Sequence, residues 1–187
     1  MKISILLPYK ENFSPAYAGA VSIFIKDTLQ ISEFKKNTVV YGNTNYKDKF
    51  NIKYVNLNYK KSLIKSSTRS YILEFLKKEK QNKSDIIEFH NRPSYLKYLN
   101  NLKYAKKVLY FHNDPLEMNG SKNLSDRIFL IDNLDKIIFN SDWSKSRFIK
   151  DLDDTYIHSS KLQVIKQSIN NKKINLNNKK KIITFVG

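Results

Sequence analysis

Two short polar segments, each directly after an apolar run, carry the side chains best suited to chemistry. His112, Asn113 and Asp114 follow one apolar run, and His90 and Asn91 follow another. A histidine at the end of a buried strand can donate a hydrogen bond to a substrate hydroxyl or stabilise charge that develops in a reaction. The alternative is a loop histidine that a backbone carbonyl satisfies. We expect His112 to be catalytic and its four named companions to bind ligand.

Two further candidates stand where helices are predicted to begin. Gly19 and Ala20 open a helical pattern after the first apolar run, and Ser141 precedes another. A glycine there lets the backbone approach a ligand, and a helix N-terminus favours an anion. The alternatives are a glycine that permits tight helix entry and a serine that caps its helix. We expect all three residues to contribute to ligand binding, although neither G-x-G-x-x-G nor a P-loop is present.

The sequence does not predict a metal site. Cysteine is absent, which excludes a disulfide framework, a zinc-thiolate site and a cysteine nucleophile. The two strand-end histidines and Asp114 are the only candidate ligands that the pattern brings near one another, and they lack H-E-x-x-H or D-x-D spacing.

The elements that must position these residues alternate between strand and helix. Short apolar runs predict buried parallel strands, and apolar residues spaced by three and four predict helices. The predicted strands are residues 3–7, 38–41, 52–57, 85–89, 107–111, 136–139, 162–165 and 182–187, and the predicted helices are 19–31, 70–80, 95–102, 124–133 and 143–152. We place Trp143 and Phe148 of the last helix in the core.

This alternation predicts an α/β fold, a doubly wound, Rossmann-like parallel sheet with helices on both faces. Such sheets bind ligands beyond the carboxyl ends of their strands. All the polar segments named above fall at those ends.

The net charge of +17 comes mainly from lysine, which supplies 30 of the 34 basic residues. Base recognition favours arginine, so no specific nucleic acid is expected. Codon bias and solubility explain much of the charge, and an anionic membrane surface or a phosphorylated substrate remains open. No apolar run approaches the roughly 20 residues of a membrane span. The apolar run at residues 1–7 is too short for a signal peptide, so we expect a cytoplasmic protein.

Taken in order, these segments resemble the N-terminal half of a GT-B glycosyltransferase of the retaining family 4, or group 1. The resemblance rests on the first strand and its loop into Ala18-Gly19-Ala20, where the family usually has a Gly pair, and on residues 88–91, 110–114, 138–144 and 164–170. Residues 181–187 resemble the first strand of the donor domain. Ala20 replaces the second glycine, and residues 166–168 differ from the family's linker.

The resemblance implies that residues 1–169 form an acceptor-side domain and that residues 170–187 are a linker and the first strand of a C-terminal donor domain. It implies transfer of a sugar from a nucleotide-sugar to a glycan or lipid-linked acceptor, with retention, without a protein-bound metal or other cofactor. Gly19 would lie near the donor phosphates or the acceptor, and His112 would face the transferred sugar. Synthesis of cell-envelope polysaccharide at the inner face of the membrane, with contact to that membrane, belongs to the same expectation.

Because the family's basic pair and acidic motif lie in its C-terminal domain, we expect this chain alone to be inactive. Two other interpretations stay open. One is a non-catalytic basic α/β domain that binds RNA or an anionic membrane. The other is a self-contained hydrolase, for which Asp114 and Asp142 are the candidate acids or nucleophiles.

Overall fold

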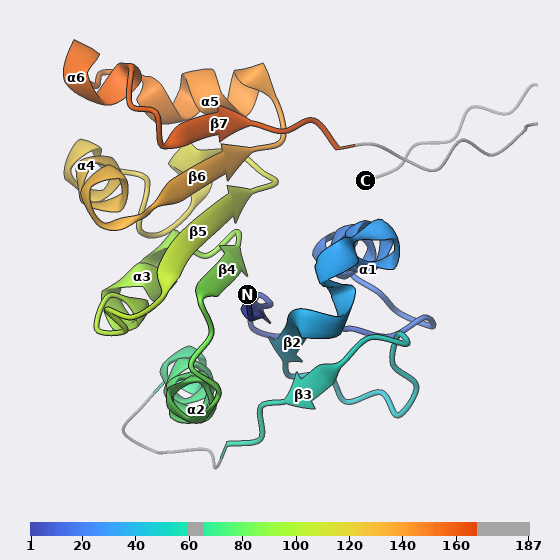
Figure 1. The fold of residues 1–187 in the computed structure, drawn as a ribbon. Coiled ribbons are helices and arrows are strands. Elements are labelled where there is room, and N and C mark those ends of the chain that lie inside the picture. Colours follow the sequence, from blue (N-terminus) through green and yellow to red (C-terminus); the bar gives the residue numbers. More distant parts are fainter. Residues whose placement is uncertain (60–65, 168–187) are drawn as a thin grey trace, which may run out of the picture.

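Seven short strands form one parallel sheet in the computed structural model, which describes residues 1–59 and 66–167 (Figure 1). The strands are β1 (Ile3–Leu6), β2 (Thr38–Gly42), β3 (Tyr54–Asn56), β4 (Ile86–His90), β5 (Lys106–Phe111), β6 (Lys136–Phe139) and β7 (Leu162–Val164). Their order is β3-β2-β1-β4-β5-β6-β7. The chain builds the sheet in one direction from β1 and in the other from β4, so the predicted doubly wound, Rossmann-like fold is confirmed.

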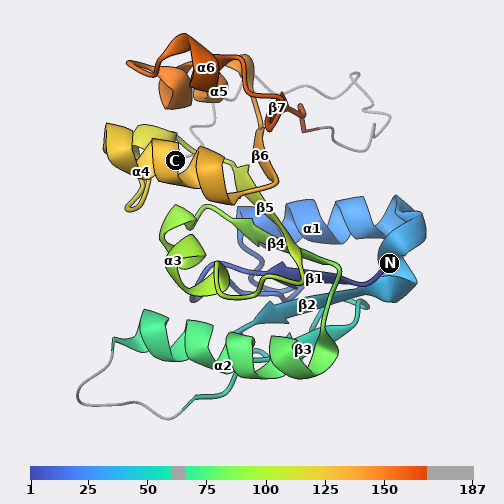
Figure 2. The same cartoon turned by 60° about the vertical axis from the view of Figure 1, so that its left-hand side comes forward.

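Helices cover both faces of this sheet, as the sequence predicts. They are α1 (Ala20–Ile31), α2 (Ser67–Asn82), α3 (Leu96–Leu99), α4 (Leu124–Asn133), α5 (Asp142–Ile149) and α6 (Asp154–Ile157), with 3-10 turns η1 (Glu33–Asn37), η2 (Pro93–Tyr95) and η3 (Pro115–Glu117). Figures 1 and 2 show α1 on the opposite side of the strands from α2, α3 and α4. Among the described residues, none of the helices combines the length and apolarity needed to cross a membrane.

The core consists of two layers, one on each face of the sheet. On the larger side, Phe111, Phe139 and Phe148 pack together with ring centroids 5.2–5.7 Å apart. Burying each such ring stabilises the fold by about 2–3 kcal/mol. On the other side, Ile25 of α1 packs on Leu7 and the first strands. Alternation of side chains along each strand assigns the two layers, because successive residues point to opposite faces.

Strand register places the two predicted histidines on the face covered by α1. His90 pairs with Tyr110 across β4 and β5. His112 lies two residues beyond Tyr110 and therefore projects to the same face. Phe24 of α1 contacts the rings of His90, Tyr110 and His112, with centroids 6.1, 5.0 and 5.0 Å away. The sheet edge thus brings together side chains that are 22 residues apart in sequence.

The structure departs from the sequence prediction in a few places. The prediction that Trp143 is core is wrong, because its side chain is 60% exposed at the start of α5, whereas Phe148 is fully buried. Residues five positions apart on a helix point about 140° away from each other, so both aromatic side chains could not face the sheet, and local pattern alone did not decide which one does. Strand β3 is three residues long, and α2 begins three residues earlier than predicted. The predicted linker and strand at residues 170–187 lie outside the described residues.

Candidate functional site

The candidate site lies at the carboxyl ends of β4 and β5, beside the point where the strand order reverses. His90 is the last residue of β4 and is fully buried. His112 follows β5 and is partly exposed. Their imidazoles meet directly, with His90 Nδ1 2.8 Å from His112 Nε2. The rings are nearly parallel, with centroids 5.1 Å apart.

A carboxylate at the far end of this pair fixes its hydrogen-bond direction. Glu88 Oε1 lies 2.8 Å from His90 Nε2. An ionised carboxylate only accepts hydrogen bonds, so Nε2 of His90 carries a proton, and in the neutral form of the ring its Nδ1 is then an acceptor. His112 must therefore donate through its own Nε2–H, which leaves His112 Nδ1 as an acceptor. The side-chain amide of Gln167 occupies that acceptor, 2.5 Å away.

Aromatic packing keeps His112 neutral. Burial, with a further contribution from neighbouring His90, lowers the pKa of His112 from 6.5 to about 3. Tyr110 stacks on His112 with ring centroids 4.6 Å apart. Burial, followed by the charge of Glu88, raises the pKa of Tyr110 to about 12. The Tyr110 hydroxyl donates to the carbonyl of Ile165, which ties the segment after β7 to this site.

Two asparagines hold the backbone of His112 in place. Asn91 Oδ1 accepts from the His112 backbone N–H at 2.7 Å, and Asn140 Nδ2 donates to the His112 carbonyl at 2.7 Å. Asn91 itself has a φ of 48°, in the left-handed region that asparagine tolerates better than most residues. Its Nδ2 also donates to Oδ1 of exposed Asn113 at 3.4 Å. The structure therefore brings together His90, Asn91, His112 and Asn113, as the shared sheet edge predicts.

Asp114 and Ser141 have local partners. Asp114 Oδ1 accepts from the Leu116 backbone N–H at 3.0 Å and caps η3, and Asp114 Oδ2 pairs with Arg147 at 3.0 Å. Burial raises the pKa of Asp114, but the Arg147 and Leu116 hydrogen bonds outweigh it and hold that pKa below its usual range. Ser141 caps α5 by accepting from the Ser144 N–H. Contact of Asp114 and Ser141 with a ligand stays a prediction.

The N-terminus of α1 already holds an anion from the chain itself. Gly19 is the N-cap, with no side-chain hydrogen bond of its own. Glu11 Oε1 accepts from the backbone N–H of Ser22 at 3.0 Å, and a Cβ added at Gly19 would collide with the Glu11 carboxylate. Ala20 follows as the exposed first residue of α1. The roles predicted for Gly19 and Ala20 remain predictions, and a ligand phosphate here would have to displace Glu11.

Several residues of the site escaped the sequence prediction. Glu88 gave a usable signal, because it stands two residues before His90 on a strand and so shares its face. The sequence offers no sign of Phe24 or Gln167. Phe24 reaches His112 only through the packing of α1, and Gln167 only through the path of the chain after β7. In the described part of the chain, no three His, Asp or Glu side chains gather to hold a metal ion. The expectation that no metal is bound stays a prediction.

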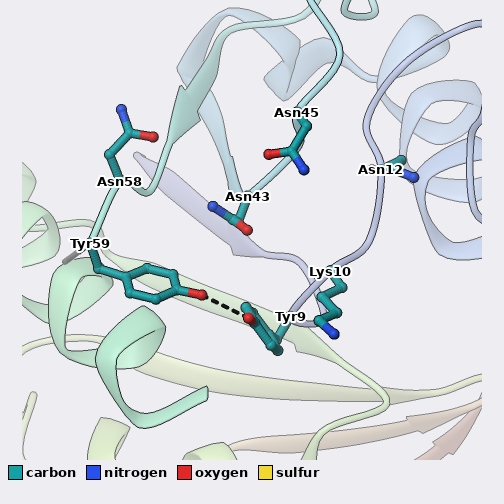
Figure 3. A pocket seen from close by; sticks show the side chains of 7 residues that line it. All are labelled: Tyr9, Lys10, Asn12, Asn43, Asn45, Asn58 and Tyr59. Carbon is teal, nitrogen blue, oxygen red and sulfur yellow. Dashed lines mark hydrogen bonds between the residues drawn. The ribbon is translucent and has the colours of Figure 1, made fainter. Parts of the chain in front are cut away.

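Two cavities flank this centre at the same edge of the sheet. One, of about 450 Å³, is lined by residues that include Asn91 and Arg92. The other, also about 450 Å³, lies beyond β1, β2 and β3 and includes Tyr9 (Figure 3). The Tyr9 backbone N–H donates to the hydroxyl of Tyr95, a residue of the first cavity, at 2.9 Å. This hydrogen bond links the walls of the two cavities.

Known proteins resemble this chain in structure and not in sequence. No family model and no curated protein sequence matches it. HepE of Anabaena, solved with UDP, is 17% identical with a TM-score of 0.59 over 91% of this chain and 45% of HepE. A glycosyltransferase from Rickettsia africae is 17% identical with a TM-score of 0.59 over 90% of this chain and 44% of its own. Sucrose-phosphate synthase from Thermosynechococcus elongatus is 8% identical with a TM-score of 0.58, over 89% of this chain and 48% of its own.

At these identities the likeness establishes the fold. The chain spans a little under half the length of these three structures.

Proposed function

We propose that this chain is the N-terminal part of a glycosyltransferase that takes its sugar from a nucleotide-sugar. The observation that carries the proposal is a neutral histidine, His112, fixed at the sheet edge with a hydrogen-bond acceptor, Nδ1, facing the exposed residue Gln167. A sugar hydroxyl can donate to this nitrogen in place of the Gln167 amide. A phosphate at neutral pH offers almost no donor, and a neutral imidazole offers it no charge. The position therefore suits the sugar better than the diphosphate.

The similar structures support the same class of ligand. HepE structures were determined with UDP and with UDP-glucose. This fold covers 45% of the HepE chain. That coverage supports a two-part enzyme in which residues outside this fold supply the nucleotide site. In that division, His112 holds a hydroxyl of the transferred sugar, while Asn91 and Asn140 hold the His112 backbone. Donor and acceptor contacts of Gly19, Ala20, Asn113, Asp114 and Ser141 remain part of the proposal. A ligand contact of His90 is also predicted, but it would require movement of the site, because His90 is fully buried and both of its ring nitrogens have partners.

Finer points rest on the sequence resemblance alone. These are retention of the anomeric configuration, a glycan or lipid-linked acceptor in cell-envelope polysaccharide synthesis, action in the cytoplasm at the inner membrane face, and absence of a cofactor. We also propose that residues 1–187 alone transfer no sugar, because the positive charge needed by a leaving diphosphate would come from the rest of the enzyme.

The test is turnover by the protein that carries this chain in its full natural length. The protein is incubated with a panel of UDP-, GDP- and ADP-sugars, and nucleotide release is measured with neutral disaccharides and with a lipid-linked saccharide as acceptors. We expect release with at least one donor, and a fall of about 5- to 150-fold in kcat/KM for His112→Ala, the equivalent of about 1–3 kcal/mol for a lost buried hydrogen bond. Release that is equal in wild type and His112→Ala would contradict the proposal.

A further inference from the structure

A third cavity, of about 120 Å³, lies between α1 and the strands β1 and β4, on the face of the sheet that carries the two histidines. Its walls are mainly apolar and include Ile5 of β1 and Ile25 and Leu29 of α1. Of the described residues that line it, only Glu88 carries a charge. An apolar cavity of about 150 Å³ holds one benzene molecule, so this one suits a ligand of about five heavy atoms.

Glu88 presents this cavity with a carboxylate that is only partly used. Its Oε1 lies 2.8 Å from His90 Nε2, and its side chain is 26% exposed. Within residues 1–59 and 66–167, His90 is its only hydrogen-bond or ion-pair partner. An ionised carboxylate can accept about four hydrogen bonds, and a charge in apolar surroundings needs an opposite charge beside it. A cationic donor that reaches Oε2 would therefore be bound favourably.

Two of the three hydroxyl groups in the described lining are already bonded within the chain. Ser32 Oγ accepts from the backbone N–H of Phe34 at 3.1 Å, and the Thr38 hydroxyl donates to the carbonyl of Phe34 at 2.9 Å. The exposed residues Thr28 and Phe34 leave the cavity accessible from solvent. Small-molecule sites typically combine apolar walls with a few well-placed polar groups. One carboxylate and no cation in the described lining match an ammonium group on a short hydrocarbon chain.

The cavity shares two residues with the surroundings of the histidine pair. Glu88 bonds to His90, and His90 Nδ1 lies 2.8 Å from His112 Nε2. Phe24 lines the cavity and contacts the ring of His112, with centroids 5.0 Å apart. A ligand at Glu88 would therefore be felt at both imidazoles. Because a cation stabilises the ionised carboxylate, it would hold the proton on His90 Nε2 and keep Nδ1 of His112 as an acceptor.

We propose that this cavity binds a small alkylammonium ligand, with its ammonium group on Glu88 and its hydrocarbon part beneath α1. The binding step does not depend on sugar transfer. Residues 60–65 and 168–187, outside the described residues, contain eight lysines and no aspartate or glutamate. They cannot add a carboxylate side chain to the cavity, whereas a lysine side chain from them would bring the same chemistry as a free amine.

The test measures binding of defined amines to the full-length protein by saturation-transfer NMR and by the nitrogen-15 shifts of the two imidazoles. The probes are isobutylamine, isopentylamine and cyclopentylamine, all ammonium ions at neutral pH. Isobutanol and isopentanol are the neutral comparisons, and isovalerate is the anionic one. Glu88→Gln removes the charge, and Thr28→Met fills part of the cavity without changing Glu88. The matched controls are Glu74→Gln on α2 and Thr155→Met, an exposed threonine of α6.

We expect at least one amine to bind saturably, with a Kd in the millimolar range that so few heavy atoms allow, and to shift the nitrogen-15 signals of His90 and His112. Glu88→Gln should raise this Kd about 10-fold or more, because a hydrogen bond to a charged group is lost. Thr28→Met should abolish saturable binding, and both control variants should bind as the wild type does. The alcohols and isovalerate should bind about 10-fold more weakly than the amines, or not at all.

Three results would overturn the inference. The first is that no amine binds saturably. The second is that an alcohol binds as tightly as the amine of the same shape. The third is that either Glu88→Gln or Thr28→Met, once shown to be folded, binds the amine as its control does.

A further variant, in which glutamine replaces the eight lysines of residues 60–65 and 168–187, identifies the source of the ammonium group. An unchanged Kd supports a free amine as the ligand. A lower Kd supports the same site with a lysine of the chain as a competing occupant. Amine binding with no nucleotide-sugar turnover would leave this inference standing and remove the proposed function, and turnover that depends on His112 without any amine binding would do the reverse.

Discussion

Replacing Glu88 by glutamine should allow either ring nitrogen of His112 to carry the proton. In the wild type, the Glu88 carboxylate accepts from His90 at 2.8 Å, and this sets the direction of the bond from His112 to His90. A glutamine amide can donate as well as accept. In Glu88→Gln, His90 can carry its proton on Nδ1 and donate to His112, so that His112 Nδ1 becomes a donor. The acceptor that we assign to a sugar hydroxyl is then lost in part of the molecules.

The size of this effect follows from the kind of hydrogen bond exchanged. A bond to a charged partner contributes about 1.5–3 kcal/mol, and a neutral one about 0.5–1.5 kcal/mol. His90 is fully buried, so solvent does not replace the lost partner. The difference of about 1–1.5 kcal/mol sets an upper limit of about 5- to 13-fold on the fall in kcat/KM, reached when the other tautomer of His112 predominates. The change conserves side-chain volume, so the fold itself should tolerate it.

Two readouts separate this positioning role from a loss of packing. Nitrogen-15 NMR of the imidazoles should show His112 protonated on Nε2 in the wild type and on a mixture of nitrogens in Glu88→Gln. The control Glu74→Gln makes the same change on α2, where Glu74 pairs with Lys78 at 3.9 Å. It should change neither the tautomer of His112 nor kcat/KM. An unchanged His112 tautomer in Glu88→Gln would refute the reasoning, whatever its activity.

Three further outcomes follow from the same contacts. Because the pKa of His112 is lowered to about 3 in the folded chain, its contribution to stability is present above pH 6.5 and is lost as the pH falls toward 3. In urea melts at pH 7, 5 and 4, the free energy of unfolding should therefore decline less steeply with falling pH for His112→Gln than for the wild type. Parallel declines would contradict this. Asp114→Ala should reduce the free energy of unfolding by about 1–2 kcal/mol in urea melts, because it removes the cap of η3 and the partner of Arg147, and a change within experimental error would argue against the cap. Gly19→Ala should lower the free energy of unfolding by about 0.5–2 kcal/mol, because the new methyl group displaces Glu11 from the start of α1. The loss should be smaller in a Glu11→Ala background, and equal losses in both backgrounds would show that Glu11 is not the cause.

The sequence predicted most of the sheet because its strands obey local rules. Residues 136–139 are short, apolar and bounded by polar residues, and β6 has the same bounds. The convergence of His90 and His112 also followed from sequence, since parallel strands end at one edge. Strand β3, by contrast, is short and half-buried, so alternation over residues 52–57 overstated its length.

The chemistry within the site depended on contacts between distant residues. The neutral state of His112 arises from the packing of Phe24 and Tyr110, which no local pattern reports. The contact of Glu11 with Gly19 spans a loop of irregular path, so the helix start at Ala20 was predictable but the anion in front of it was not. Trp143 shows the same limit, because the helix was predictable and the face it presents was not.

The most direct test of the central claim compares two affinities in two proteins. Titration calorimetry measures the Kd of the nucleotide-sugar that turns over, and the Kd of the matching nucleoside diphosphate, for the wild type and for His112→Ala. We expect His112→Ala to weaken binding of the nucleotide-sugar about 5-fold or more while the diphosphate binds unchanged, because His112 Nδ1 holds a sugar hydroxyl and not a phosphate. Equal weakening of both ligands, or of neither, would contradict that assignment.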